Sequence, residues 1–577
     1  MRHASKHTSP THWWHDVRLA AQVLAWRATW NRYDLDQRPD GLPEVFVSAR
    51  AAAALIPDGA TVMSCGMAAH HRASLMFWAI RDRFEATGSP HDLTWCAVGG
   101  AGGRGLIPGT LEELGRPGLV TKALLGHVET VRSFLRLADA GELELHTIPQ
   151  GQFALLLESQ ANGGPLTRES EVGVGSFLDP RVGRGSCVSD VATEQFVGRN
   201  GDQLVYRMPR LDVAVVVAPW ADRAGNLLRT DAACLTEIYD LARAVHANGG
   251  TVIAIVAGVA PDDPQAVYVR SEWVDAIVVH PEVDQTGAVH QRHAWHALST
   301  TGTDDPEQAV ADARLVNRLM GVTPRRTAAD AALARLGASV AAAHLKSGSV
   351  INIGVGLPEE VGRLLGEEGF NTVVHQTTET GVFGGTPLPG AFFGAAVNPR
   401  EQLRSAEMFH RYRHGVDLTC LGFLELDGAG RVNSSRRGDR PTEAVGPGGL
   451  PDIAHYASLV LFVGRFALGE RLEVGDGRLT VAEPGVCRFV DTVREVTFDG
   501  ALARARGQQV VVATHRALLR LGADGWVVEA VMPGIRVQED VIDPAGGAIA
   551  LPPGGVDAVE VLSRQIVDGD GFVLPLP

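Results

Sequence analysis

One glutamate, Glu379, stands where a carboxylate could act as a nucleophile. Residues 372–378 before it are rich in β-branched side chains and predict a strand, and Gly381, Gly384 and Gly385 follow it. Glycines let a substrate approach the backbone closely. A carboxylate held there near backbone donors and apolar groups can have a shifted pKa and can attack an electrophilic carbonyl. A glutamate on a surface turn is the alternative that these residues leave open.

A second glycine-containing loop follows residues 350–353, which read as a buried strand. Gly354 and Gly356 permit close approach to the backbone, and Pro358 stands where a helix would begin. The free N–H groups at the start of that helix could hold a phosphate or an amide. A tight strand-to-helix turn without a ligand is the alternative.

Two groups of histidines were considered as ligands. His290, His293 and His296 recur at three-residue spacing, but no acidic or cysteine partner completes a metal set, so we expect a solvated segment and no metal site. His70 and His71 lie in a first-half loop equivalent to the one above, where they could line a ligand or cap a helix.

The elements that position these residues are duplicated. Residues 211–227 align without gaps on residues 416–432, and each segment reads as an apolar strand, an Asp/Gly turn and a returning strand. Upstream, residues 53–66 resemble residues 342–354. Strands alternating with helices predict two related α/β domains, and the hairpins indicate mixed, mainly parallel sheets with flanking helices. Ligands are expected at the carboxyl ends of the strands.

The length of 577 residues exceeds what one core supports. We expect an N-terminal helical extension over residues 1–44, a first half over 45–300, a linker over 301–327 and a second half, carrying Glu379, over 328–577.

Composition excludes several classes of function. A net charge of −15 argues against nucleic-acid binding, which needs a basic surface. The six cysteines show no C-x-x-C spacing, so reduced thiols are expected instead of disulfides or a zinc site. The chain shows neither a secretory signal pattern nor an apolar run of about 18 residues, so a cytoplasmic protein without a membrane span is expected.

Taken together, these segments resemble family I CoA-transferases, in particular the single-chain branch of acetate and propionate CoA-transferases. The segment TTETGVFGGTPLPGAFFGAAVNPR is similar to the E-x-G-x-x-G-G signature of that branch followed by F-G-x-x-V-N, and the similarity extends over roughly residues 45–577. The resemblance implies the fused α and β halves of the CoA-transferase fold.

The resemblance also assigns residues. The signature glutamate, the nucleophile of the family, falls on Glu379. Gly449, in the segment VGPGGLPDI, matches the residue whose backbone N–H helps to form an oxyanion hole. The CoA-binding loop of the family matches Gly354, Val355, Gly356, Leu357 and Pro358.

A ping-pong mechanism through a glutamyl-CoA thioester on Glu379 is therefore implied, with an acyl-CoA donor and a carboxylic acid acceptor as substrates. Coenzyme A would serve as substrate and covalent intermediate, with no permanently bound cofactor and no metal. Because family members are commonly oligomers, we expect a homo-oligomer, with no nucleic-acid or membrane partner. An acyl-CoA hydrolase using the same glutamate, a non-catalytic CoA-binding protein and the CoA-transferring subunit of a larger lyase or decarboxylase are the alternatives.

Overall fold

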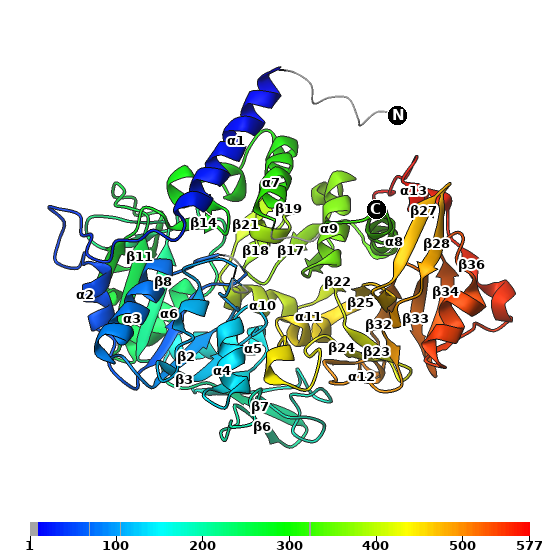
Figure 1. The fold of residues 1–577 in the computed structure, drawn as a ribbon, viewed down its shortest axis with the longest axis horizontal. Helices are drawn as coiled ribbons and strands as arrows, with labels where there is room; N and C mark the ends of the chain where they lie inside the picture. Colours follow the sequence, from blue (N-terminus) through cyan, green and yellow to red (C-terminus); the bar gives the residue numbers. More distant parts are fainter. Residues whose placement is uncertain (1–9, 69, 104–105, 322–324) are drawn as a thin grey trace.

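Two α/β units lie side by side in the computed structural model, which describes residues 10–68, 70–103, 106–321 and 325–577 (Figure 1). The first unit is built on seven strands, all paired in parallel. Their spatial order is β13 (Ala276–Val279), β11 (Thr251–Val256), β8 (Val213–Ala218), β1 (Thr61–Ser64), β2 (Leu93–Ala97), β3 (Val120–Leu125) and β4 (Glu144–Thr147). The helices around it are α2 (Ala49–Ala54), α3 (Ser74–Thr87), α4 (Arg132–Asp139), α5 (Gln150–Ala161) and α6 (Ile238–Ala247).

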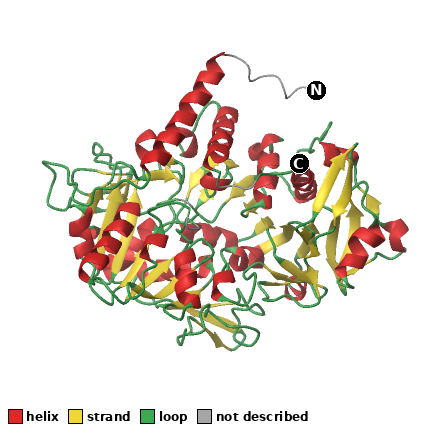
Figure 2. Ribbon diagram, viewed as in Figure 1, coloured by secondary structure: helices red, strands yellow, loops and turns green. Residues whose placement is uncertain are grey.

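The second unit is built on an eleven-stranded mixed sheet. Its order is β21 (Glu401–Gln402), β18 (Val382–Phe383), β17 (His375–Thr377), β16 (Val350–Ile353), β22 (Val416–Leu421), β25 (Ala457–Val463), β32 (Gln509–Ala513), β33 (Ala517–Gly522), β34 (Gly525–Val531) and β35 (Ile549–Ala550), with β36 (Glu560–Val561) also on β34. Its helices are α8 (Ala328–His344), α9 (Leu357–Glu367), α10 (Ser405–Arg413), α11 (Leu450–Tyr456), α12 (Gly500–Ala505) and α13 (Arg564–Asp568). Figure 2 shows helices distributed around both sheets, so the predicted α/β fold class is confirmed.

The predicted Asp/Gly hairpins form, but their strands make small sheets of their own and leave the first main sheet purely parallel. In both hairpins the turn aspartate accepts a backbone N–H, Asp222 from Asn226 at 2.8 Å and Asp427 from Arg431 at 3.1 Å. These sheets contain β9 (Trp220–Ala221), β10 (Leu227–Leu228) and β12 (Val267–Val269), and β30 (Phe489–Val490), β23 (Glu425–Asp427), β24 (Arg431–Asn433) and β31 (Phe498–Asp499).

The remaining strands form short ribbons. They are β5 (Thr167–Ser170), β7 (Gln203–Arg207) and β6 (Val197–Asn200); β14 (Asp284–Thr286) with β15 (Val289–His290); β19 (Thr386–Pro387) with β20 (Ala396–Val397); β26 (Ala467–Leu468) with β29 (Val486–Cys487); and β27 (Arg471–Gly475) with β28 (Arg478–Glu483).

The duplication is visible at the centre of each sheet. Strand β1 pairs with β2 and β8, and β16 pairs in the same way with β17 and β22. Asp212 and Asp417, which are aligned in the two copies, make equivalent hydrogen bonds. Asp212 accepts the N–H of Thr61 at 2.8 Å, and Asp417 accepts the N–H of Val350 at 2.7 Å. Each carboxylate satisfies the first N–H of the neighbouring central strand, so the two units repeat one construction.

Outside the two sheets, α1 (Pro10–Thr29) packs on α7 (Pro306–Met320), which lies in the expected linker, and both project from the body in Figure 1. Apolar side chains of both helices join residues of the segment 388–397 in one buried cluster. The domain boundaries expected from the sequence remain a prediction. In the described part of the chain, no helix has both the length and the apolar character needed to span a membrane.

The two units are joined by buried polar contacts around α5 and α11. The Asp452 carboxylate accepts the Gly151 N–H at 2.8 Å and the Gln152 side-chain amide at 2.6 Å. Nearby, Arg404 of the second unit pairs with Asp240 of the first at 2.6 Å. Because buried polar groups need partners, these contacts fix how the units face each other.

Replacing Asp452 by alanine should therefore lower the free energy of unfolding by about 1–3 kcal/mol, since it leaves two buried donors without an acceptor. Urea unfolding would measure the difference, with Asp524→Ala, a change at an exposed aspartate, as the control. Equal midpoints for Asp452→Ala and the native chain would show that this contact does not hold the units together.

Candidate active site

The two loops singled out in the second half leave one edge of the sheet side by side. Strands β16 and β17 are parallel neighbours, with Asn352 opposite Thr377. The carboxyl ends of parallel strands lie at one edge, so residues 354–358 and 378–381 emerge next to each other. Strand β17 is shorter than the predicted 372–378, because a 3₁₀ turn, Phe370–Thr372, occupies the residues before it.

Glu379 lies on a tight turn directly after β17. The Thr378 N–H donates to the Val382 carbonyl at 3.1 Å, and the Gly381 N–H donates to the Thr378 carbonyl at 3.2 Å. Gly381 has φ +101°, and a methyl group there would lie 1.8 Å from the Leu403 carbonyl oxygen, so no other residue fits. The predicted need for glycine after the glutamate therefore has a steric cause.

The environment of Glu379 favours the neutral acid. Its side chain is partly buried, and this burial raises its pKa to about 7, moderated by its own backbone N–H. At neutral pH the carboxylate is therefore present but poorly solvated. That state suits a nucleophile, because less water must be removed before it attacks.

A buried network of hydrogen bonds holds the end of the strand that leads to Glu379. The Tyr412 hydroxyl donates to Thr377 Oγ1 at 3.0 Å and accepts from the Asn352 amide at 3.2 Å, and Thr419 Oγ1 donates to Asn352 at 3.1 Å. Burial, and then the nearby Glu379 carboxylate, raise the pKa of Tyr412 well above its usual value. No sequence pattern singled out Tyr412 or Asn352 as a site residue.

Gly449 lies against Glu379. It directly precedes α11, and a methyl group on it would come within 2.9 Å of Glu379 Cγ and 3.0 Å of Glu379 Oε1. The two residues are 70 positions apart in the sequence, and the fold brings them into contact. The site therefore pairs a half-buried carboxylate with a glycine backbone.

The loop that carries Gly449 is held by the first unit. The Gly448 N–H donates to the Gly126 carbonyl at 3.0 Å, and the Gln150 N–H donates to the Gly448 carbonyl at 3.0 Å. Asp452, one turn further on, is anchored to α5 as described above, and burial raises its pKa to about 6. The site consequently lies at the junction of the two units.

His70 and His71 of the first unit are linked by hydrogen bonds to the turn that carries Glu379 and to the segment after it. Both are buried; His70 Nε2 donates to the Phe393 carbonyl at 2.8 Å, and His71 Nδ1 forms a 3.0 Å hydrogen bond with Thr236 Oγ1. The Thr236 N–H in turn donates to the Thr380 carbonyl at 3.2 Å. Burial lowers the pKa of both histidines, that of His71 to about 3, so each is neutral at neutral pH.

The predicted CoA-binding loop is an open turn. Gly354 is fixed by its N–H to the Cys420 carbonyl at 2.9 Å, whereas Val355 is 58% exposed and a methyl group on Gly356 would meet nothing within 4 Å. Gly356 adopts φ +96° just before α9, which begins at Leu357 and has Pro358 in its first turn, as predicted. The opening leaves room for a ligand against the backbone.

One carboxylate, that of Glu359, lies in the first turn of α9. Burial raises the pKa of Glu359 to about 7, and the backbone N–H groups of Gly356 and Gly390 moderate this rise. Arg326 donates to the Gly356 carbonyl at 2.8 Å. This hydrogen bond fixes one side of the open turn.

Two of the three histidines at three-residue spacing pair with acids. His290 lies 2.8 Å from Glu282, and His296 lies 2.8 Å from Asp231. Across the described ranges, no three histidine, cysteine, aspartate or glutamate side chains gather as they would around a metal ion.

Comparison with known proteins assigns the family. The family model for coenzyme A transferase matches residues 46–280. A caffeate CoA-transferase of Acetobacterium woodii is 32% identical over 520 residues, covering 86% of this chain and 93% of that protein. The acetate CoA-transferase YdiF of Escherichia coli K12 is 29% identical, over 92% of this chain and 96% of its own.

Solved structures agree. The acyl-CoA transferase YdiF of Escherichia coli O157:H7 superposes as the apoenzyme with a TM-score of 0.78 at 27% identity, covering 94% of this chain and 99% of that one. A thioester complex of the same enzyme with CoA gives a TM-score of 0.80 at 27% identity, over 94% and 100% of the two chains. The fold and the overall sequence similarity thus agree with the residue patterns, and the chain belongs to the family I CoA-transferases.

Proposed function

We propose that this CoA-transferase moves CoA from an acyl-CoA to a carboxylic acid by a ping-pong reaction on Glu379. The observation that carries the proposal is the contact between Glu379 and Gly449, which puts a half-buried carboxylate beside a backbone that can donate to an oxyanion. The CoA-thioester complex of the YdiF relative supports a covalent course.

In the first step, the Glu379 carboxylate adds to the thioester carbonyl, and the carbon–sulfur bond breaks to leave an enzyme-bound mixed anhydride and CoA thiolate. The thiolate then attacks the glutamyl carbonyl and releases the first acid, which gives the glutamyl-CoA thioester. An incoming carboxylate repeats the steps in reverse. Each step conserves the acyl bond energy, so the residues have only to orient the groups and stabilise negative charge.

Gly449 would supply an N–H to each tetrahedral oxyanion, an effect worth about 3 kcal/mol per donor. The open turn from Gly354 to Pro358 would receive part of the CoA chain, because it lies beside Glu379 at the same sheet edge. Tyr412 and Asn352 position the strand that ends at the nucleophile. The relatives act on caffeate and on acetate, and a carboxylic acid is accordingly the acceptor class proposed here.

Hydrolysis by the same glutamate is the competing reaction. It would use the same intermediate, opened by water in place of an acid. The two reactions differ only in the group that opens the intermediate, and the mass measurement below separates them.

Intact mass measurement after incubation with acetyl-CoA or propionyl-CoA should show one CoA adduct on the native protein and none on Glu379→Gln, which keeps the shape but lacks the nucleophilic oxygen. The exposed Glu539→Gln is the matched control and should form the adduct. Added acetate should discharge it. Discharge at the same rate in buffer alone would identify a hydrolase, and an adduct on Glu379→Gln would move the nucleophile elsewhere.

The pH dependence of kcat/KM for the acyl-CoA should follow the raised pKa of Glu379. Because the neutral acid is not a nucleophile, kcat/KM should fall about tenfold per pH unit below about 7 and level off above it. Glu359 has a similar pKa, so Glu359→Gln must keep the same profile. A flat profile between pH 5.5 and 8 is incompatible with this assignment.

Gly449→Ala should lower kcat by about a hundredfold, because the added methyl group pushes on the Glu379 carboxylate and shifts it from its reactive position. Steady-state kinetics would measure this, with circular dichroism to verify folding. Gly475→Ala, where a methyl group meets nothing within 4 Å, is the control and should retain full activity. Native-like turnover in Gly449→Ala would remove Gly449 from the site.

A further inference from the structure

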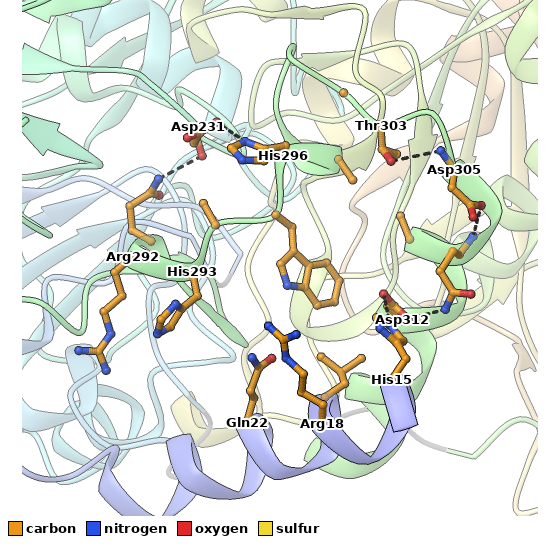
Figure 3. A pocket seen from close by; sticks show the side chains of 18 of the residues that line it. His15, Arg18, Gln22, Asp231, Arg292, His293, His296, Thr303, Asp305 and Asp312 are labelled. Atoms are coloured by element: carbon orange, nitrogen blue, oxygen red, sulfur yellow. Dashed lines mark hydrogen bonds and ion pairs between the residues drawn. The ribbon is translucent and has the colours of Figure 1, made fainter. Parts of the chain in front are cut away.

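A second cavity lies outside the Glu379 site, under the N-terminal helix. Its volume is about 840 Å³, within the range of small-ligand sites. Three segments wall it: α1, the turn over residues 291–297, and residues 302–312, which include the start of α7 (Figure 3). The described residues that line it include neither Glu379 nor Gly449, and none of them is part of the predicted CoA-binding loop.

Most acidic groups of the cavity already have partners. Asp312 pairs with His15 at 2.9 Å and accepts the Gln308 amide at 2.7 Å, and Asp231 pairs with His296 at 2.8 Å. Asp305 accepts the Gln308 N–H at 3.0 Å. Each of these carboxylates therefore has a hydrogen-bond partner within the protein, as the dashed lines in Figure 3 show. Asp304 also lines the cavity and is exposed.

In contrast, several side-chain donors of the cavity have no hydrogen-bond partner among the described residues. Arg18 and Gln22 are one helical turn apart on α1, and in Figure 3 both extend from the helix toward the middle of the cavity. His293 and the indole N–H of Trp295 belong to the facing turn. Within the described residues, none of these four side chains makes a hydrogen bond or an ion pair. Because Arg18, Gln22 and His293 are exposed, an anion bound among them would replace water as the partner of these donors.

The side of the cavity that carries Trp295 is formed by an aromatic ring held in place by its neighbours. The Trp295 ring stacks on Phe392, with centroids 5.3 Å apart and planes at 26°. The Trp295 backbone N–H is fixed by the Gln285 side chain at 2.8 Å. Trp220 also lines the space. Indole rings held in this way favour planar groups, which gain dispersion contact without ordering a flexible chain.

We propose that this cavity binds a planar organic anion. Its carboxylate or phosphate would pair with Arg18, whose fork of donors matches either group, and would accept from Gln22 and His293. Its flat part would lie against Trp295. The site is additional to the transfer reaction, and Phe392, in the segment after Glu379, forms the far side of the same aromatic stack.

Titration calorimetry on the full chain tests the proposal with benzoate and AMP as probes. At least one of them should bind at one site per chain, benzoate if a carboxylate is preferred and AMP if a phosphate is preferred. Cyclohexanecarboxylate, which is not planar, should bind at least tenfold more weakly than benzoate. Binding of acetate or inorganic phosphate as tight as that of both planar probes, or no binding of any probe, would overturn the proposal.

Variants place the binding event. Arg18→Ala should weaken the preferred probe at least tenfold, and Gln22→Ala should weaken it less, because one neutral donor is lost. Arg318→Ala, at an exposed arginine of α7 outside the cavity, is the matched control and should bind as the native chain does. A probe bound equally by Arg18→Ala and the native chain would occupy the Glu379 site instead, and the inference would be wrong. The test does not depend on turnover, so it can fail while the transferase proposal stands.

Discussion

The proposed active centre depends on how far a carboxylate can be withdrawn from water while it still ionises. Full solvation would make Glu379 a weak nucleophile, and complete burial without donors would keep it protonated at neutral pH. A pKa of about 7 lies between these limits. The Tyr412 and Asn352 network holds the end of β17, the Gly449 backbone lies beside the carboxylate, and the tight turn at Gly381 fixes the chain after it. None of these groups gives the carboxylate a positive partner.

That balance needs both units. The loop before Gly449 is bonded to Gly126 and Gln150, and the turn at Thr380 is bonded to Thr236 and backed by His70. Contacts from the first unit brace the loop and the turn that bring Gly449 against Glu379 in the second unit. The buried contacts of Asp452 and Arg404 between the units therefore belong to the chemistry as much as to stability.

Local sequence patterns were sufficient to predict features that depend only on one strand and the turn next to it. Strand β16, the start of α9 and the two Asp/Gly hairpins followed from apolar runs, glycines and capping residues. The main sheet of the first unit turned out purely parallel because the hairpin strands left it. Contacts such as His70 to Phe393 and Gly151 to Asp452 join residues about 300 positions apart, and no periodicity encodes them. The cavity beside Trp295 is likewise assembled from separate segments.

The two copies of the fold differ at the position where the second unit carries the proposed nucleophile. In the first sheet β2 holds the place that β17 holds in the second, next to the central strand. Where β17 runs into Glu379, β2 runs into Gly99 and Gly100. A methyl group on Gly99 would lie 2.7 Å from the Gly66 carbonyl oxygen, and one on Gly100 would lie 2.6 Å from the His127 carbonyl oxygen. Backbone fills the space that a side chain would need. One copy of the fold therefore presents a carboxylate at this edge of its sheet, and the other fills the equivalent edge of its own sheet with backbone.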